Sequence, residues 1–220
     1  MDNLPDVANG RFPERNIIEL NLMVNKTLAY TGKDYGRTAV FASDLNDGGT
    51  SFKNISNSLS AGMPGDWTVE SIHLDDVNVT MARSQLLAAM NRGTALVTFT
   101  GHSGPQEWTF SNLFNIQNAE SLTNAGKPFV VVQWGCWNNY YVDPMYNYLV
   151  QSFLLSGDRG AVAVLGATTL ADSGSEHLLG HLVTPRLVQP GMTLGQALQL
   201  SKSELAQTHP DLLDVLLGWS

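Results

Sequence analysis

The sequence contains a cysteine and a histidine whose types and spacing suit proton transfer between them. Cys136 is the only cysteine among 220 residues, and His102 precedes it by 34 residues. A free thiol is mostly protonated near neutral pH, and a nearby imidazole can take its proton to give a nucleophilic thiolate. A single cysteine also excludes a disulfide framework and a cysteine-rich zinc site. The pair therefore predicts a hydrolytic site with Cys136 as nucleophile and His102 as general base.

Each of these two residues directly follows a segment of strand character. The apolar run 94–100 leads into Gly101 and His102, and the β-prone run 129–134 leads into Gly135 and Cys136. Catalytic groups of parallel sheets collect beyond the carboxyl ends of the strands, and a separation of this length suits one strand–helix–strand unit. We expect the two strands to be neighbours and the side chains to face one cleft. The competing hypothesis is a buried structural cysteine and a turn histidine that never meet.

Glycines on both loops favour sharp turns and a close approach of backbone to substrate. Gly101 and Gly104 flank the histidine, and Gly135 precedes the cysteine. The backbone N–H groups of Ser103 and Cys136 are predicted to form an oxyanion hole.

Two tryptophans near these loops are candidates for the wall of a substrate cleft. Trp108 follows the histidine by six residues, and Trp137 follows the cysteine directly. Large aromatic side chains beside core strands also serve as packing, which is the alternative for both.

The rest of the chain alternates strand-like and helix-like segments. This alternation predicts an α/β fold with a mostly parallel sheet sandwiched by helices. Thr80 is expected to cap the third helix, and Thr193 with Gln196 has the form of a capping box that opens the last one. Strands are expected at 37–43, 67–74, 94–100, 129–134 and 160–166, and helices at 14–30, 52–59, 80–91, in parts of 111–126, between Pro144 and Gly157, and at 194–207.

Composition excludes several other classes of function. The net charge of −8 and the absence of a Lys/Arg cluster argue against nucleic acid as a partner. The sequence contains no run of 18 apolar residues, so no membrane span is predicted. Its first residues lack the pattern of a signal peptide. His177 and His181 have the spacing of a two-histidine metal face, but no His-Glu-x-x-His pattern accompanies them. We therefore predict no metal ligands.

Four segments, in order along the chain, resemble the gingipain-type cysteine peptidases. The segment Phe99–Gly104 (FTGHSG), followed by Trp108, is similar to the histidine loop of that family. Val132–Asn139 (VQWGCWNN) occupies the place of its nucleophile strand and loop, and Gly160–Thr168 (GAVAVLGAT) resembles its next core strand. Asp6–Pro13 (DVANGRFP) is similar to its entry segment.

The resemblance implies a caspase-like fold and hydrolysis of peptide bonds in a protein or peptide substrate. It assigns Cys136 as the nucleophile and His102 as the general base. It also implies an acidic residue near the histidine, and the matching position is Asp44, which otherwise serves as a turn or cap residue. Ser103 departs from the family pattern, which has glycine directly after the histidine; a positive φ there would strain serine and alter the oxyanion hole.

The resemblance also sets expectations for the whole protein. It places the peptidase catalytic domain at residues 4–218, as a fragment cut from a longer chain at both ends. It implies a secreted or cell-surface location and no cofactor, and it allows a structural calcium ion. The alternative function is a catalytically inactive adaptor or secretion-assembly module on the same fold, for which Ser103 is the supporting feature.

Overall fold

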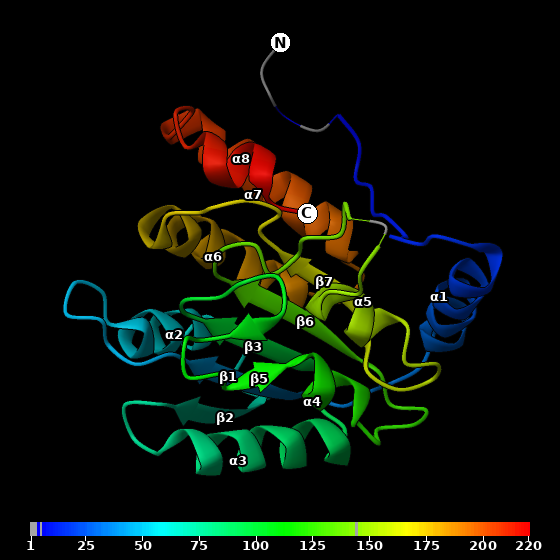
Figure 1. The fold of residues 1–220 in the computed structure, drawn as a ribbon. Helices are drawn as coiled ribbons and strands as arrows, with labels where there is room; N and C mark the ends of the chain where they lie inside the picture. Colours follow the sequence, from blue (N-terminus) through cyan, green and yellow to red (C-terminus); the bar gives the residue numbers. More distant parts are fainter. Residues whose placement is uncertain (1–3, 5, 144) are drawn as a thin grey trace.

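The computed structural model describes residues 4, 6–143 and 145–220, and its centre is a parallel sheet. The five strands lie in the order β2-β1-β3-β6-β7, and every neighbouring pair is parallel. Figure 1 shows the sheet between helices, with α1 beyond its β7 side. The bounds are β1 Thr38–Ser43, β2 Thr68–His73, β3 Leu96–Thr100, β6 Phe129–Trp134 and β7 Ala161–Gly166.

Eight helices and a small hairpin complete the described part of the chain. The hairpin pairs β4 (Glu107–Trp108) with β5 (Phe114–Asn115) in antiparallel fashion and lies just after the histidine loop. The helices are α1 Ile17–Tyr30, α2 Phe52–Ser60, α3 Val79–Arg92, α4 Ile116–Glu120, α5 Leu149–Leu154, α6 Ser173–Leu187, α7 Leu194–Thr208 and α8 Leu213–Gly218.

Short polar side chains begin most of the long helices. The side chain of Asp172 accepts hydrogen bonds from the first turn of α6, and Ser51 does the same for α2. The capping box predicted at Thr193 and Gln196 is confirmed at the start of α7. The prediction that Thr80 caps α3 is wrong, because Asn78 accepts the capping hydrogen bond two residues earlier.

Alternate residues of the central strands point into two separate cores. On β3, Val97 and Phe99 join a cluster with side chains of α3 and α5, whereas Leu96 joins a cluster with side chains of α2, α6, α7 and α8. Both faces of the sheet are therefore covered, which explains the continuous apolar runs of β1, β3 and β6 in the sequence. The predicted α/β fold with a parallel sheet between helices is confirmed.

The predicted order of the two central strands is also confirmed. β3 pairs directly with β6, and Thr100 lies opposite Trp134 at their carboxyl ends. The expected helix in 111–126 is reduced to the short α4, and Pro144, expected to precede α5, lies outside the described residues. The sequence predicted neither the β4–β5 hairpin nor α8, and for α6 it offered only the four-residue spacing of His177 and His181.

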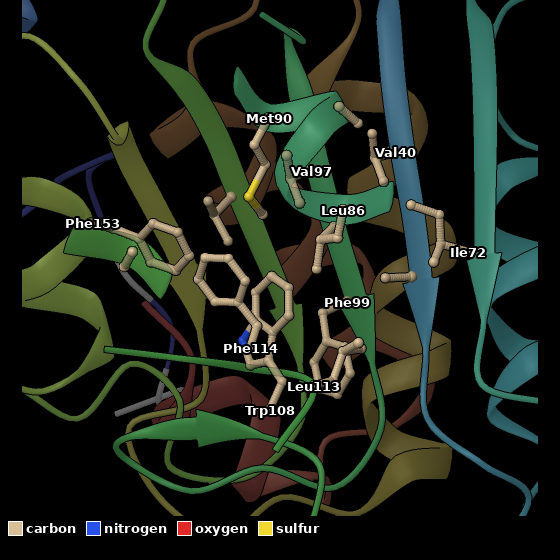
Figure 2. Close-up of a cluster of buried hydrophobic side chains, with 14 of the residues drawn as sticks. Val40, Ile72, Leu86, Met90, Val97, Phe99, Trp108, Leu113, Phe114 and Phe153 are labelled. Carbon is tan, nitrogen blue, oxygen red and sulfur yellow. The ribbon is translucent and has the colours of Figure 1, made fainter. Parts of the chain in front are cut away.

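An aromatic stack fills the core between the sheet and α3 and α5 (Figure 2). Phe99 stacks on Trp108 with ring centroids 4.7 Å apart, and Phe114 stacks on Phe153 at 5.3 Å. Phe153 also contacts the rings of Trp108 and Phe129. Trp108 is fully buried in this stack, so this tryptophan supports the histidine loop from beneath.

We expect replacement of Phe153 by alanine to destabilise the protein by about 3 to 5 kcal/mol, because a fully buried ring leaves a cavity. Chemical denaturation measures this loss. Phe110→Ala is the matched control, since that ring is 89% exposed, and it should change the free energy of unfolding by less than about 0.5 kcal/mol. Equal effects of the two variants would contradict the packing described.

Candidate active site

The loops that follow β1, β3 and β6 meet at the carboxyl edge of the sheet and enclose a cavity of about 220 Å³. His102 and Cys136 both line this cavity, as predicted from their positions after neighbouring strands. The start of α6 closes the opposite side. The remaining lining residues are Asp47, Thr50, Phe52, Gly101, Gly135, Ala171, Asp172, Ser173 and Glu176.

The imidazole of His102 is held by a carboxylate and two aromatic rings. Its Nε2 lies 3.0 Å from Oδ2 of Asp47. Phe52 contacts the ring edge-on and Phe110 stacks on it, each with centroids 5.0 Å apart. The other oxygen of Asp47 accepts hydrogen bonds from the N–H groups of Gly49 and Thr50, and these bonds hold the pKa of Asp47 below its usual value. Asp47 is therefore an ionised partner that orients the ring.

The side chain of Asp44 contacts the backbone of the same histidine. Its Oδ2 accepts a hydrogen bond of 3.2 Å from the N–H of His102, and its Oδ1 accepts one from Leu45. Asp44 as a residue is 5% exposed, and burial raises the pKa of its carboxyl. The family resemblance points to Asp44 as the acidic residue near the histidine, with a turn or cap role as the alternative. In the structure Asp47 contacts the ring, and Asp44 holds the loop through the backbone N–H of His102. Asp47 stands three residues further along the same loop, and residue spacing could not separate the two.

Cys136 is half-buried, and its thiol faces α6. Sγ lies 3.4 Å from the carbonyl oxygen of Ala171, close to the start of that helix. The loop after the cysteine runs beside the segment that follows β7, where Trp137 donates to the carbonyl of Thr169 and Asn139 to that of Ala167. These bonds fix the nucleophile loop on the side away from the histidine.

Two glycines let the loops that follow β1, β3 and β6 approach one another. A Cβ at Gly135 would lie 2.3 Å from the carbonyl oxygen of Gly101 and 2.4 Å from Oγ of Ser103. A Cβ at Gly101 would lie 2.3 Å from Cβ of Asp44, at a φ of 155°. A side chain at Gly135 would force the cysteine and histidine loops apart, and one at Gly101 would collide with Asp44 on the loop after β1. The sequence prediction of glycine-dependent turns therefore has a specific cause, which is contact between these loops.

A buried polar network beneath the loops was missed by the sequence analysis. Oε1 of Gln133 accepts from the indole of Trp108 at 2.6 Å, and its Nε2 donates to the carbonyl of Asn138. The Asn138 amide donates to Oγ of Ser103, which in turn donates to the carbonyl oxygen of Cys136 at 2.8 Å. A polar residue inside the apolar strand 129–134 was the signal for Gln133.

Ser103 thus ties the histidine loop to the nucleophile loop. It is not among the described non-glycine residues of positive φ, so serine causes no backbone strain after His102. Trp108 lies in the core and does not line the cavity. Trp137 has a φ of 57° and packs edge-on against Tyr140, and it too lies outside the cavity lining.

Glu176 is a buried carboxyl in the cavity that sequence reasoning missed. It lies in the first turn of α6, is 4% exposed, and accepts a hydrogen bond of 3.1 Å from the indole N–H of Trp219. Burial raises its pKa to about 8, so the carboxyl is mostly neutral at pH 7. A glutamate one turn into a helix is ordinary in sequence, and nothing there signals its burial.

Metal-ligating groups do not gather in the described part of the chain, where no cluster of three or more His, Cys, Asp or Glu side chains could hold an ion. His177 and His181 contact each other at 2.8 Å on α6, outside the cavity lining. No helix among the described residues is long and apolar enough to cross a membrane.

A parallel α/β domain that carries a cysteine and a histidine on adjacent strand ends has the architecture of a cysteine hydrolase. The chain belongs to peptidase family C25, whose sequence profile matches residues 1–217. This is the gingipain family, and the resemblance stated from the motifs is confirmed. No curated protein sequence matches the chain.

Solved structures share this fold at low sequence identity. The complex of the pro- and mature domains of RgpB from Porphyromonas gingivalis superposes with a TM-score of 0.85 at 17% identity, over 100% of this chain and 56% of that one. The Arg-specific cysteine proteinase gingipain R (RgpB) gives 0.80 at 18% identity, over 96% and 54%. A third structure, described as a protease, gives 0.69 at 16%, over 87% and 47%. The chain therefore spans about half the length of the solved proteins it matches.

Replacement of Gly135 by alanine tests the contact between the loops. Because the added methyl group would meet backbone and Ser103, we expect at least about 2 kcal/mol of destabilisation, measured by denaturation. Gly65→Ala is the matched control, since its Cβ would meet nothing within 4 Å. A Gly135→Ala protein as stable as the control would contradict the close approach.

Glu176 makes stability depend on pH. Its pKa is about 8 in the folded protein against 4.5 for a free side chain, so the native state holds a proton that the unfolded chain releases. This stabilisation is complete below pH 4.5 and is lost as pH rises through 8. Relative to Glu176→Gln, the wild type should lose on the order of 3 to 5 kcal/mol between pH 5 and pH 9. A difference that stays constant with pH would contradict the buried neutral carboxyl.

Proposed function

We propose that this domain is a cysteine endopeptidase in which Cys136 is the nucleophile and His102 the general base. The observation that carries the proposal is that both side chains line one cavity at adjacent ends of β3 and β6. Membership of a cysteine peptidase family supports a peptide or protein substrate. The family also supports a secreted or cell-surface location for the parent protein.

In the proposed reaction, His102 takes the thiol proton and Sγ of Cys136 attacks the carbonyl carbon of the scissile peptide bond. The tetrahedral intermediate collapses as the C–N bond breaks, and the imidazolium gives its proton to the leaving amine. A thioester remains on Cys136. Water then attacks this thioester while His102 accepts its proton, and the proton returns to the thiol as the acid product leaves.

The contact with Asp47 decides which ring nitrogen serves the thiol. An ionised carboxylate only accepts hydrogen bonds, so Nε2 of His102 carries the proton that faces Asp47. Nδ1 is then the basic nitrogen that exchanges a proton with Cys136. Asp47 also stabilises the imidazolium that forms during the reaction, as a carboxylate does in other triads.

The oxyanion hole is proposed at the backbone N–H groups of Ser103 and Cys136. Neither group donates a hydrogen bond to any of the described residues, which leaves both free for a substrate oxygen. The loops that hold them are fixed by Ser103 Oγ and Asn138, so the donors are in place before substrate binds.

Cleavage of a mixture of unstructured peptides, followed by mass spectrometry, tests the activity. We expect new amino termini from the wild type and none from Cys136→Ala or His102→Ala, which lack the nucleophile and the base. Wild-type cleavage rates in Cys136→Ala would overturn the proposal. An intact fold with no cleavage and an inert thiol would instead favour the non-catalytic adaptor.

Asp47→Asn tests the orientation of the imidazole. Loss of a charge-assisted hydrogen bond should lower kcat by about tenfold to a hundredfold and leave KM nearly unchanged, because the bond strengthens as the imidazolium forms. Steady-state peptide cleavage measures this effect. Asp211→Asn, at an exposed site away from the cavity, is the control and should match the wild type. Equal kinetics for both variants would remove Asp47 from the mechanism.

A further inference from the structure

Glu176 lies where three segments of the chain meet. Its carboxyl accepts a hydrogen bond of 3.1 Å from the indole N–H of Trp219. Glu176 also lines the cavity beside Gly135, whose backbone N–H lowers the pKa of the carboxyl. Gly135 directly precedes Cys136, and Trp219 stacks on Trp134 at the end of β6 with centroids 4.2 Å apart. One side chain of α6 therefore joins the nucleophile turn to the last residues of the chain.

The same carboxyl faces the reaction cavity. Glu176 lines the cavity together with Cys136 and His102, although it lies 40 residues beyond the cysteine. No cation among the described residues pairs with Glu176, so its burial at 4% exposure is unusual, because ionisation there is costly. A buried acid that lines the cavity beside the cysteine therefore points to a role in the site.

We propose that Glu176 is a positioning residue of the cysteine site, whose carboxyl holds the Gly135–Cys136 turn by tying it to Trp219. This proposal rests on the proposed function, because it takes Cys136 on that turn to be the nucleophile. It adds Glu176 to the site as a residue that acts through Gly135 and does not itself exchange protons with the substrate.

The protonation state of this carboxyl affects the thiol. A neutral carboxyl retains acceptors for both N–H groups and leaves the cavity free of a further negative charge, whereas an ionised one would oppose a thiolate beside it. The charges that face it favour the neutral form, since Asp172 from the start of α6 and Asp214 from α8 both raise its pKa. The other titratable groups around it are His102, Asp47 and Cys136 in the cavity and Lys202 on α7, whose Nζ donates to the carbonyl oxygen of Trp219.

Two substitutions of Glu176 distinguish its role in holding the turn from the effect of its charge on the thiol. Glu176→Gln keeps the size and an acceptor oxygen but cannot ionise, and Glu176→Leu removes both acceptors. Glu120→Gln, at the exposed end of α4, is the matched control. Hydrogen exchange of segment 135–139 by mass spectrometry reports the order of the turn, and iodoacetamide labelling of Cys136 from pH 6 to 10 reports the thiol.

At pH 7 we expect exchange in segment 135–139 to rise by about tenfold in Glu176→Leu, as expected for lost buried hydrogen bonds, and to change by less than about threefold in Glu176→Gln. Above pH 8, labelling of the wild type should fall below that of Glu176→Gln, while the control follows the wild type. Thermal unfolding and circular dichroism establish that each variant is folded.

Unchanged exchange in Glu176→Leu would overturn the positioning role, and identical labelling profiles for wild type and Glu176→Gln would overturn the effect of the carboxyl's charge on the thiol. If Glu176→Leu fails to fold, Trp219→Phe decides instead, because it removes the indole donor to Glu176 and should likewise raise exchange in segment 135–139. Failure of the peptidase proposal is distinct, because it appears as an ordinary thiol in the wild type itself, whereas the exchange of segment 135–139 is independent of thiol reactivity.

Discussion

The site depends on the close approach of two backbone turns at the ends of neighbouring strands. β3 and β6 pair in parallel, and the N–H of Gly101 continues that pairing beyond the strands by donating to the carbonyl of Trp134. Because Gly135 has no side chain, its turn can approach the carbonyl oxygen of Gly101 and Oγ of Ser103. His102 and Cys136 are the next residues on each side, so the pairing of the strands itself places both in one cavity.

The polar network beneath the turns converts this contact into a fixed geometry. Gln133, Asn138 and Ser103 join β6 to both loops through hydrogen bonds, and Gln133 and Asn138 are fully buried. Burial makes such groups costly unless they are paired, and their pairing selects one arrangement of the loops. The indole of Trp108 completes the network from the aromatic core, which links the stability of that core to the geometry of the site.

Much of the fold followed from the sequence, because each buried strand is a short apolar run that ends in glycine or polar residues. The neighbouring placement of Cys136 and His102 followed from strand ends and a spacing of one strand–helix–strand unit. The sequence could not show which aspartate of the loop contacts the His102 ring. In the structure Asp47 contacts the ring and Asp44 contacts the backbone of His102. The burial of Glu176 could not be predicted either, because it arises from the packing of α6 against the end of the chain. Trp108 resembled a cleft residue because only the packing of the β4–β5 hairpin shows that it lies in the core.

The central claim is that His102 activates the thiol of Cys136, and the most direct test is intact-mass labelling with iodoacetamide from pH 5 to 9. A single cysteine makes the mass shift unambiguous. The account predicts rapid alkylation of the wild type below pH 7 and loss of that reactivity in His102→Ala. Labelling that follows an ordinary free thiol in both proteins would contradict it, because the two side chains would then share a cavity without proton transfer.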